Sequence, residues 1–95
     1  MRDYELIVIF NPEIPEEEMP ADIDKVSEFI TARGGSITEV KRWGKRKLAY
    51  PIKRRREGNY VLTLAKIAPE KTAELEANLR ISEKILRHML VRVGD

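Results

Sequence analysis

The side chains of this sequence that are best suited to chemistry are basic, and they are concentrated in one segment. Residues 41–56 hold nine of the 18 Lys and Arg residues and no acidic residue. Trp43 and Tyr50 lie inside this segment, and Tyr60 follows it. Basic side chains neutralise phosphates while aromatic rings stack on bases, so the combination favours a nucleic-acid-binding surface. The alternative is a strand edge whose charges only keep it soluble.

The residue types needed for most catalytic and metal sites are missing. The sequence has no cysteine, which excludes a disulfide, a thiolate zinc site and a cysteine nucleophile. Its one histidine, His88, is expected to be structural. The glycines match neither a phosphate-binding loop nor a dinucleotide fingerprint. We therefore expect no enzyme, no metal, no cofactor and no small-molecule substrate; a small hydrolase is the weakest alternative, because no loop offers an anion cradle.

Length and composition favour one compact unit. The 95 residues fit a single domain over residues 1–95, with 42% hydrophobic and 36% charged residues and a net charge of +2. The longest apolar run, Leu6–Phe10, is far shorter than a membrane span. Arg2, Asp3 and Glu5 are incompatible with a signal peptide. We expect a soluble cytoplasmic protein that does not bind a membrane.

The first half of the chain predicts a strand followed by a helix. Tyr4–Phe10 is apolar and rich in β-branched residues, which indicates a central strand. One helix stripe follows, because apolar residues recur at spacings of four, three and four: Met19, Ile23, Val26 and Ile30. Seven acids between residues 13 and 28 are expected on the opposite face. Gly34-Gly35 ends the helix.

The second half predicts two more strands, a helix and a last strand. Ser36–Trp43 is a strand, and Leu48–Ile52 either extends it or opens a new one after a break at Gly44, with Pro51 favouring an edge position. The hairpin tip is expected at residues 54–58. The remaining predicted elements are the strand Asn59–Ile67, a helix that begins at Pro69 and buries Leu75 and Leu79, and the strand Ile85–Val93.

The order β-α-β-β-α-β predicts an α+β fold, the ferredoxin-like sandwich. Its four-stranded antiparallel sheet has both helices on one face and the strand order 4-1-3-2. The first and third strands are apolar on both faces, although a sheet with one solvated face should alternate apolar and polar residues. We therefore expect an uncovered apolar face that binds a partner. The alternative is that the chain's own loops cover it.

The chain resembles the bacterial small-subunit (30S) ribosomal protein six family over nearly its whole length. The segments that carry the resemblance are Met1–Glu5, Asn11-Pro12, Gly34-Gly35, Trp43–Ile52, Gly58–Tyr60, Glu74-Leu75, Leu79–Glu83 and Leu86–His88. The resemblance implies a ribosomal protein without catalytic activity or cofactor. It also implies two partners: the central domain (platform) of 16S ribosomal RNA, and ribosomal protein eighteen of the small subunit as a heterodimer. The competing hypothesis is a non-ribosomal ferredoxin-like protein-interaction or regulatory module.

Two sets of site residues follow from this combination. The RNA-binding candidates are mostly basic: Arg2, Lys45, Arg46, Lys47, Tyr50, Lys53, Arg54, Arg55, Arg56, Arg80, Arg87 and Arg92. The partner-binding candidates are apolar or aromatic residues of the sheet: Ile7, Ile9, Trp43, Tyr60, Leu62 and Leu64. The first set should contact phosphates and bases, and the second should lie on the open face of the sheet.

Overall fold

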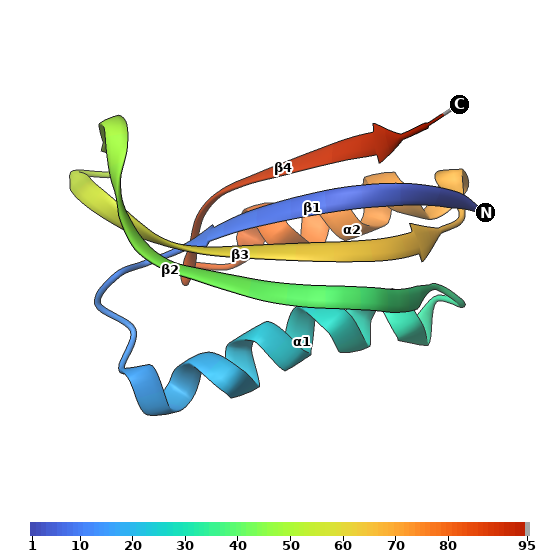
Figure 1. Ribbon diagram of the computed structural model, residues 1–95, viewed down its shortest axis with the longest axis horizontal. Coiled ribbons are helices and arrows are strands. Elements are labelled where there is room, and N and C mark those ends of the chain that lie inside the picture. Colours follow the sequence, from blue (N-terminus) through green and yellow to red (C-terminus); the bar gives the residue numbers. More distant parts are fainter. Residues whose placement is uncertain (95) are drawn as a thin grey trace.

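The computed structural model describes residues 1–94 and has the predicted ferredoxin-like α+β fold (Figure 1). Its strands are β1 (Arg2–Phe10), β2 (Ser36–Ile52), β3 (Arg55–Ile67) and β4 (Ile85–Val93). They form one antiparallel sheet in the order β2-β3-β1-β4, which is the predicted order. The helices are α1 (Met19–Ala32) and α2 (Thr72–Ile81), and each follows a short 3-10 turn, Glu16–Glu18 or Pro69–Lys71.

The core lies between the helices and one face of the sheet. Alternate residues of β1 are buried there, because successive side chains of a strand point to opposite faces: Tyr4, Leu6, Val8 and Phe10. The predicted helix stripes meet them, with Met19, Ile23, Val26 and Ile30 from α1 and Leu75 and Leu79 from α2 all buried. The two periodicities predicted from the sequence are therefore both confirmed.

The β2–β3 hairpin confirms one of the two alternatives predicted for Leu48–Ile52, extension of the same strand, and differs from the prediction at its turn. β2 runs without interruption through Gly44, where a φ of +82° and a shift in the β2–β3 register mark a bulge rather than a break. The turn lies at Lys53-Arg54 and overlaps the predicted tip, residues 54–58, only at Arg54, because Ile52 pairs with Arg55 and both turn residues have positive φ. The predicted edge position of Pro51 is confirmed, since β2 is an outer strand.

Two adjacent glycines end α1 for different reasons. Gly34 has a φ of +84°, the left-handed conformation that follows many helices. Gly35 donates its N–H to Ile30 O at 3.0 Å, and a side chain there would lie 2.8 Å from the carbonyl oxygen of Lys66 in β3. The first glycine therefore permits the turn, and the second permits the close approach of the chain to the sheet.

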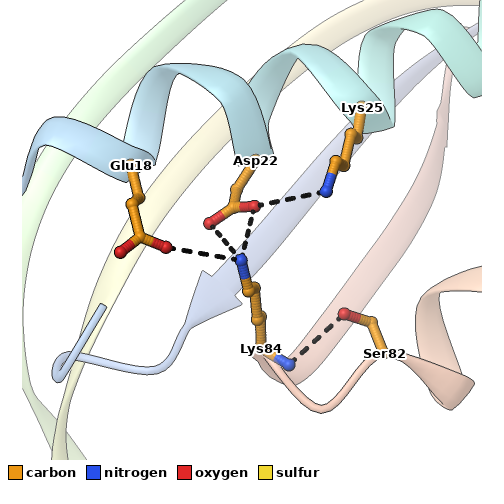
Figure 2. Close-up of polar contacts among 5 residues, drawn as sticks. All are labelled: Glu18, Asp22, Lys25, Ser82 and Lys84. Carbon is orange, nitrogen blue, oxygen red and sulfur yellow. Dashed lines mark hydrogen bonds and ion pairs between the residues drawn. The ribbon is translucent and has the colours of Figure 1, made fainter. Parts of the chain in front are cut away.

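One acid of α1 is buried, although the prediction placed all acids of this segment on the solvated face. Asp22 is only 5% exposed. Lys84 Nζ, from the loop before β4, donates to both carboxylate oxygens of Asp22 at 3.0 and 3.3 Å, as Figure 2 shows. Lys25 and Glu18 extend the cluster, with ion-pair distances of 4.0 Å to Asp22 and 3.7 Å to Lys84. The buried carboxylate is tolerated because Lys84 compensates its charge.

Lys84 is expected to stabilise the fold more than Lys25 does. Its hydrogen bond to Asp22 raises the pKa of Lys84 above the usual 10.5, assisted by the charges of Asp22 and Glu18 and opposed by partial burial. A raised lysine pKa stabilises the folded state below pH 10.5, and this contribution is lost as the pH rises through the folded-state pKa. Lys84→Met should therefore lower the thermal midpoint at pH 7 more than Lys25→Met.

The measurement is thermal unfolding followed by circular dichroism from pH 7 to pH 11. The difference between wild type and Lys84→Met should shrink above pH 10.5, whereas Lys25→Met should differ little from wild type throughout. Equal midpoints for the two variants at pH 7 would contradict the assigned role of Lys84.

Candidate nucleic-acid and protein interface

The face of the sheet away from the helices carries the predicted apolar surface. The register places Ile7 opposite Leu62 and Ile9 opposite Tyr60, and neither isoleucine belongs to the helix-side core. Leu64 follows Leu62 on the same face by strand alternation. Trp43 joins from β2, with its ring stacked on Tyr60 at 6.4 Å between centroids. The structure therefore brings all six partner-binding candidates to one surface, which we call the open face.

Strand β4 adds three apolar residues to the open face that sequence reasoning missed. Met89 pairs with Ile7, Val91 with Glu5 and Val93 with Asp3, and all three are exposed. Their alternation within β4 is visible in the sequence. The sequence does not show which face of the sheet these three side chains occupy. That depends on the register between β4 and β1, and a shift of one residue would move them to the other face.

The hairpin covers one end of the open face. Ile9 is 7% exposed, because Gly58 of β3 packs directly against it and leaves no room for a side chain. Leu48 of β2 approaches the same point. Ile9 is therefore covered by the hairpin and is not accessible to a partner, whereas Trp43, at 41% exposure, is accessible.

Three bases of residues 41–56 are paired with acids of the chain. The guanidinium of Arg55 binds both carboxylate oxygens of Glu13 at 3.0 Å, and Arg42 binds Glu16 at 2.5 Å. Lys41 lies 3.7 Å from Glu39 on its own strand. The acidic segment before α1 thus fastens the hairpin to the helix layer, a role that the sequence analysis did not foresee. Arg55 is consequently a weaker RNA-binding candidate than its neighbours.

The remaining bases of the segment have no carboxylate partner among residues 1–94. They are Lys45, Arg46, Lys47, Lys53, Arg54 and Arg56. We call these basic side chains the unpaired bases; the term never refers to nucleobases of RNA. Arg46 lies over the Trp43 ring at 5.7 Å from its centroid. The ring holds the guanidinium by a cation–π contact and leaves its charge available.

Basic residues from three separate elements meet beside the hairpin tip. Lys53 of the turn, Arg80 of α2 and Arg87 of β4 line one cavity of about 250 Å³. Lys53 Nζ also donates to Ile85 O at 3.5 Å, which ties the tip to the start of β4. The sequence proposed these three residues separately, and the structure brings them together.

Arg2 and Arg92 do not belong to this group. Both lie at the opposite end of the sheet, where Arg2 pairs with Ile67 and Arg92 pairs with Tyr4. In Figure 1 the start of β1 and the end of β4 lie toward the right and the hairpin tip is at the left. Any RNA contact through these two arginines would therefore be separate from one through the hairpin.

The expected structural role of His88 agrees with its surroundings. Its ring is largely buried, and Nε2 lies 3.0 Å from Glu76 Oε1 of α2. Within residues 1–94, no group of three or more His, Cys, Asp or Glu side chains is arranged to hold a metal ion. None of the helices described is both long and apolar enough to cross a membrane.

Comparison with known proteins identifies the family. A profile of the family described as Ribosomal protein S6 matches residues 3–92. The chain belongs to this family. The small ribosomal subunit protein bS6 of Desulforudis audaxviator is 46% identical over 92 residues, which cover 97% of this chain and 98% of that protein. The bS6 protein of Dehalococcoides mccartyi is 44% identical over 95 residues, covering 100% of this chain and 87% of that one.

A solved structure supports the same assignment. The crystal structure of 30S ribosomal protein S6 from Thermotoga maritima matches with a TM-score of 0.90 and 36% sequence identity. The match covers 96% of this chain and 86% of that chain. A member of the ribosomal protein S6 family is a non-enzymatic component of the small ribosomal subunit and is cytoplasmic in bacteria. This decides against the non-ribosomal module and against the hydrolase.

The turn of the hairpin is expected to be strained, and Arg54→Gly should relieve the strain. Lys53 and Arg54 have φ values of +49° and +68°, where side chains other than Asn, Asp and Gly are disfavoured. A glycine at position 54 should raise the free energy of unfolding by about 1 kcal/mol.

Urea unfolding measures this effect, and Arg56→Gly is the matched control. Arg56 lies in β3 outside the left-handed region, so glycine there should cost about 0.5–1 kcal/mol. A loss of stability in Arg54→Gly equal to that in Arg56→Gly would show that the turn stores no strain.

Proposed function

We propose that this ribosomal protein S6 family member binds the central domain of 16S ribosomal RNA and does so together with ribosomal protein eighteen of the small subunit. The observation that carries the proposal is the separation of two exposed surfaces, one cationic and one apolar. The unpaired bases are concentrated on the hairpin. The open face carries the exposed apolar side chains of Trp43, Met89, Val91 and Val93.

The state of the bases supports a role in RNA binding. A base that already forms a bidentate ion pair, as Arg55 does with Glu13, gains little from a phosphate because it must first give up a strong partner. The unpaired bases have no such competitor within the described chain. They can neutralise phosphates and release counterions from the RNA, which is the main source of affinity in protein–nucleic acid binding.

The open face supports a role in protein binding. Its centre, formed by Ile7, Leu62 and Leu64, is half-buried, and exposed Trp43 and Met89 flank it. Contiguous exposed apolar surface of this kind marks interaction sites, and buried aromatic residues supply much of the binding energy at protein interfaces. The charged residues around it, such as Glu5, Lys41 and Lys66, give the surface a polar rim.

Substitution of the unpaired bases should weaken RNA binding and reduce its dependence on salt. Lys45→Ala/Arg46→Ala/Lys47→Ala removes three phosphate-binding charges, so the slope of log affinity against log salt should flatten by about 2. The measurement is filter binding to a central-domain rRNA fragment with ribosomal protein eighteen present, between about 50 and 200 mM salt.

The chain offers a control with the same change of charge. Lys41→Ala/Arg42→Ala/Arg55→Ala also removes three positive charges from the hairpin, but these bases are engaged by Glu39, Glu16 and Glu13. This control variant should flatten the slope of log affinity against log salt clearly less than Lys45→Ala/Arg46→Ala/Lys47→Ala does. Equal slopes for the two triple variants would indicate that only net charge matters and that the unpaired bases are no specific site.

A charge on the open face should prevent binding to ribosomal protein eighteen. Leu62→Lys places an ammonium group at the centre of this face and should lower the affinity about 10- to 100-fold, since it removes a half-buried leucine whose full burial by the partner would contribute up to about 1.5–3 kcal/mol. The measurement is isothermal titration calorimetry with the purified partner.

Val40→Lys is the matched control for this substitution. Val40 is an exposed residue of β2 that pairs with Thr63 on the helix side of the sheet, so it carries the same new charge away from the open face. It should bind the partner as wild type does. If both variants fold and bind normally, the partner does not use the open face.

A further inference from the structure

The distal part of the β2–β3 hairpin contains a cavity separate from the one that Lys53, Arg80 and Arg87 line. It has a volume of about 520 Å³ and is lined by Lys47, Tyr50, Pro51, Arg56 and Glu57, among others. This volume lies within the range of small-molecule binding sites, about 300–1,000 Å³. The cavity is a concave site with an aromatic ring, two cations and one carboxylate.

A large bulge in β2 creates this cavity. Lys47 pairs with Glu57 and Ile52 pairs with Arg55, so the four residues 48–51 lie opposite the single residue Arg56. A bulge bends its strand and releases main-chain groups from the ladder. The strand therefore bows away from β3, and Figure 1 shows this end of the hairpin curving out of the sheet.

The aromatic ring of the cavity is held from outside the hairpin. Tyr50 is 57% exposed, yet its hydroxyl accepts a hydrogen bond of 2.6 Å from Arg87 Nη1 of β4. A surface tyrosine without such a bond would have free χ angles, and ordering it on binding would cost conformational entropy. The Arg87 bond restricts the ring before any ligand arrives.

The charges of the cavity suit a nucleotide. Lys47 and Arg56 have no carboxylate partner among the described residues and can bind phosphates on either side of a base. Glu57 also lacks an ion-pair partner there, and its carboxylate can accept a hydrogen bond from an exocyclic amino group. Pro51 and the Tyr50 ring provide apolar surfaces for the base.

We propose that this cavity binds a single unpaired nucleotide of the RNA, with its base stacked on Tyr50, its flanking phosphates at Lys47 and Arg56, and its amino group at Glu57. The proposal rests on the proposed RNA-binding function and adds a specific site to it. A base must leave its helix to stack on a side chain, so the occupant is a bulged or loop nucleotide and not a base pair. An amino group at Glu57 favours adenine, cytosine or guanine over uracil.

The experiment uses the full chain and two probes, single-stranded r(A)6 and r(U)6, followed by fluorescence anisotropy across a salt series. Tyr50→Ala should weaken r(A)6 binding about 5- to 150-fold, which is the loss expected when one base can no longer stack on an aromatic ring. The slope of log affinity against log salt should not change. Tyr50→Phe keeps the ring and should retain most of the affinity. Glu57→Ala should abolish the preference for r(A)6 over r(U)6.

The outcomes distinguish failure of this inference from failure of the proposed function. Steep salt dependence with unaltered affinity in Tyr50→Ala would leave RNA binding standing and refute the nucleotide site. Equal losses in Tyr50→Ala and Tyr50→Phe would show that the hydroxyl bond to Arg87 shapes the hairpin and that stacking is not involved. Absence of salt-dependent binding by wild type, to these probes and to the rRNA fragment alike, would overturn both.

Discussion

The fold depends on a sheet that is covered on one face only. Strands β1 and β3 are apolar on both faces, and two helices supply enough apolar surface to fill one side. The side chains of that side, such as Leu6 and Val8, are removed from water almost completely. Those of the other side remain half-buried or exposed, except where the hairpin covers Ile9. A chain of this size thus folds with an interface already built into its sheet.

The second constraint is the unequal length of the strands. β2 and β3 have 17 and 13 residues, whereas β1 and β4 have 9 each. The distal hairpin therefore extends beyond β1, and its two strands pair only with each other among residues 1–94. Side-chain contacts stabilise it instead: an ion pair joins Glu13 to Arg55, and a hydrogen bond joins Arg87 to the hydroxyl of Tyr50. These contacts come from elements on either side of the hairpin, so its orientation is fixed from two directions.

The sequence predicted what depends on local patterns. The alternation in β1 and β4 and the helical spacing of Leu75 and Leu79 are visible within a few residues, so these elements and the fold were predicted correctly. The burial of Asp22 was missed because it depends on Lys84, 62 positions away. The turn was misplaced because Lys53-Arg54 contains none of the residues that usually mark positive φ. The bulge at residues 48–51 was not predicted, because its one local signal, Pro51, was assigned to an edge position, and proline is found at edges and at bulges alike.

The acids before α1 explain why a nearly neutral chain can still present a cationic surface. Glu13 and Glu16 each neutralise one arginine of the hairpin, and both pairs also fasten the hairpin to the helix layer. Had these acids been spread evenly among the bases, the unpaired bases would each face a local competitor for phosphate. Because Glu13 and Glu16 are in direct contact with Arg55 and Arg42, each acid is offset by its own arginine, and the unpaired bases keep their positive charge. The net charge of +2 is therefore the sum of two separate surfaces and describes neither.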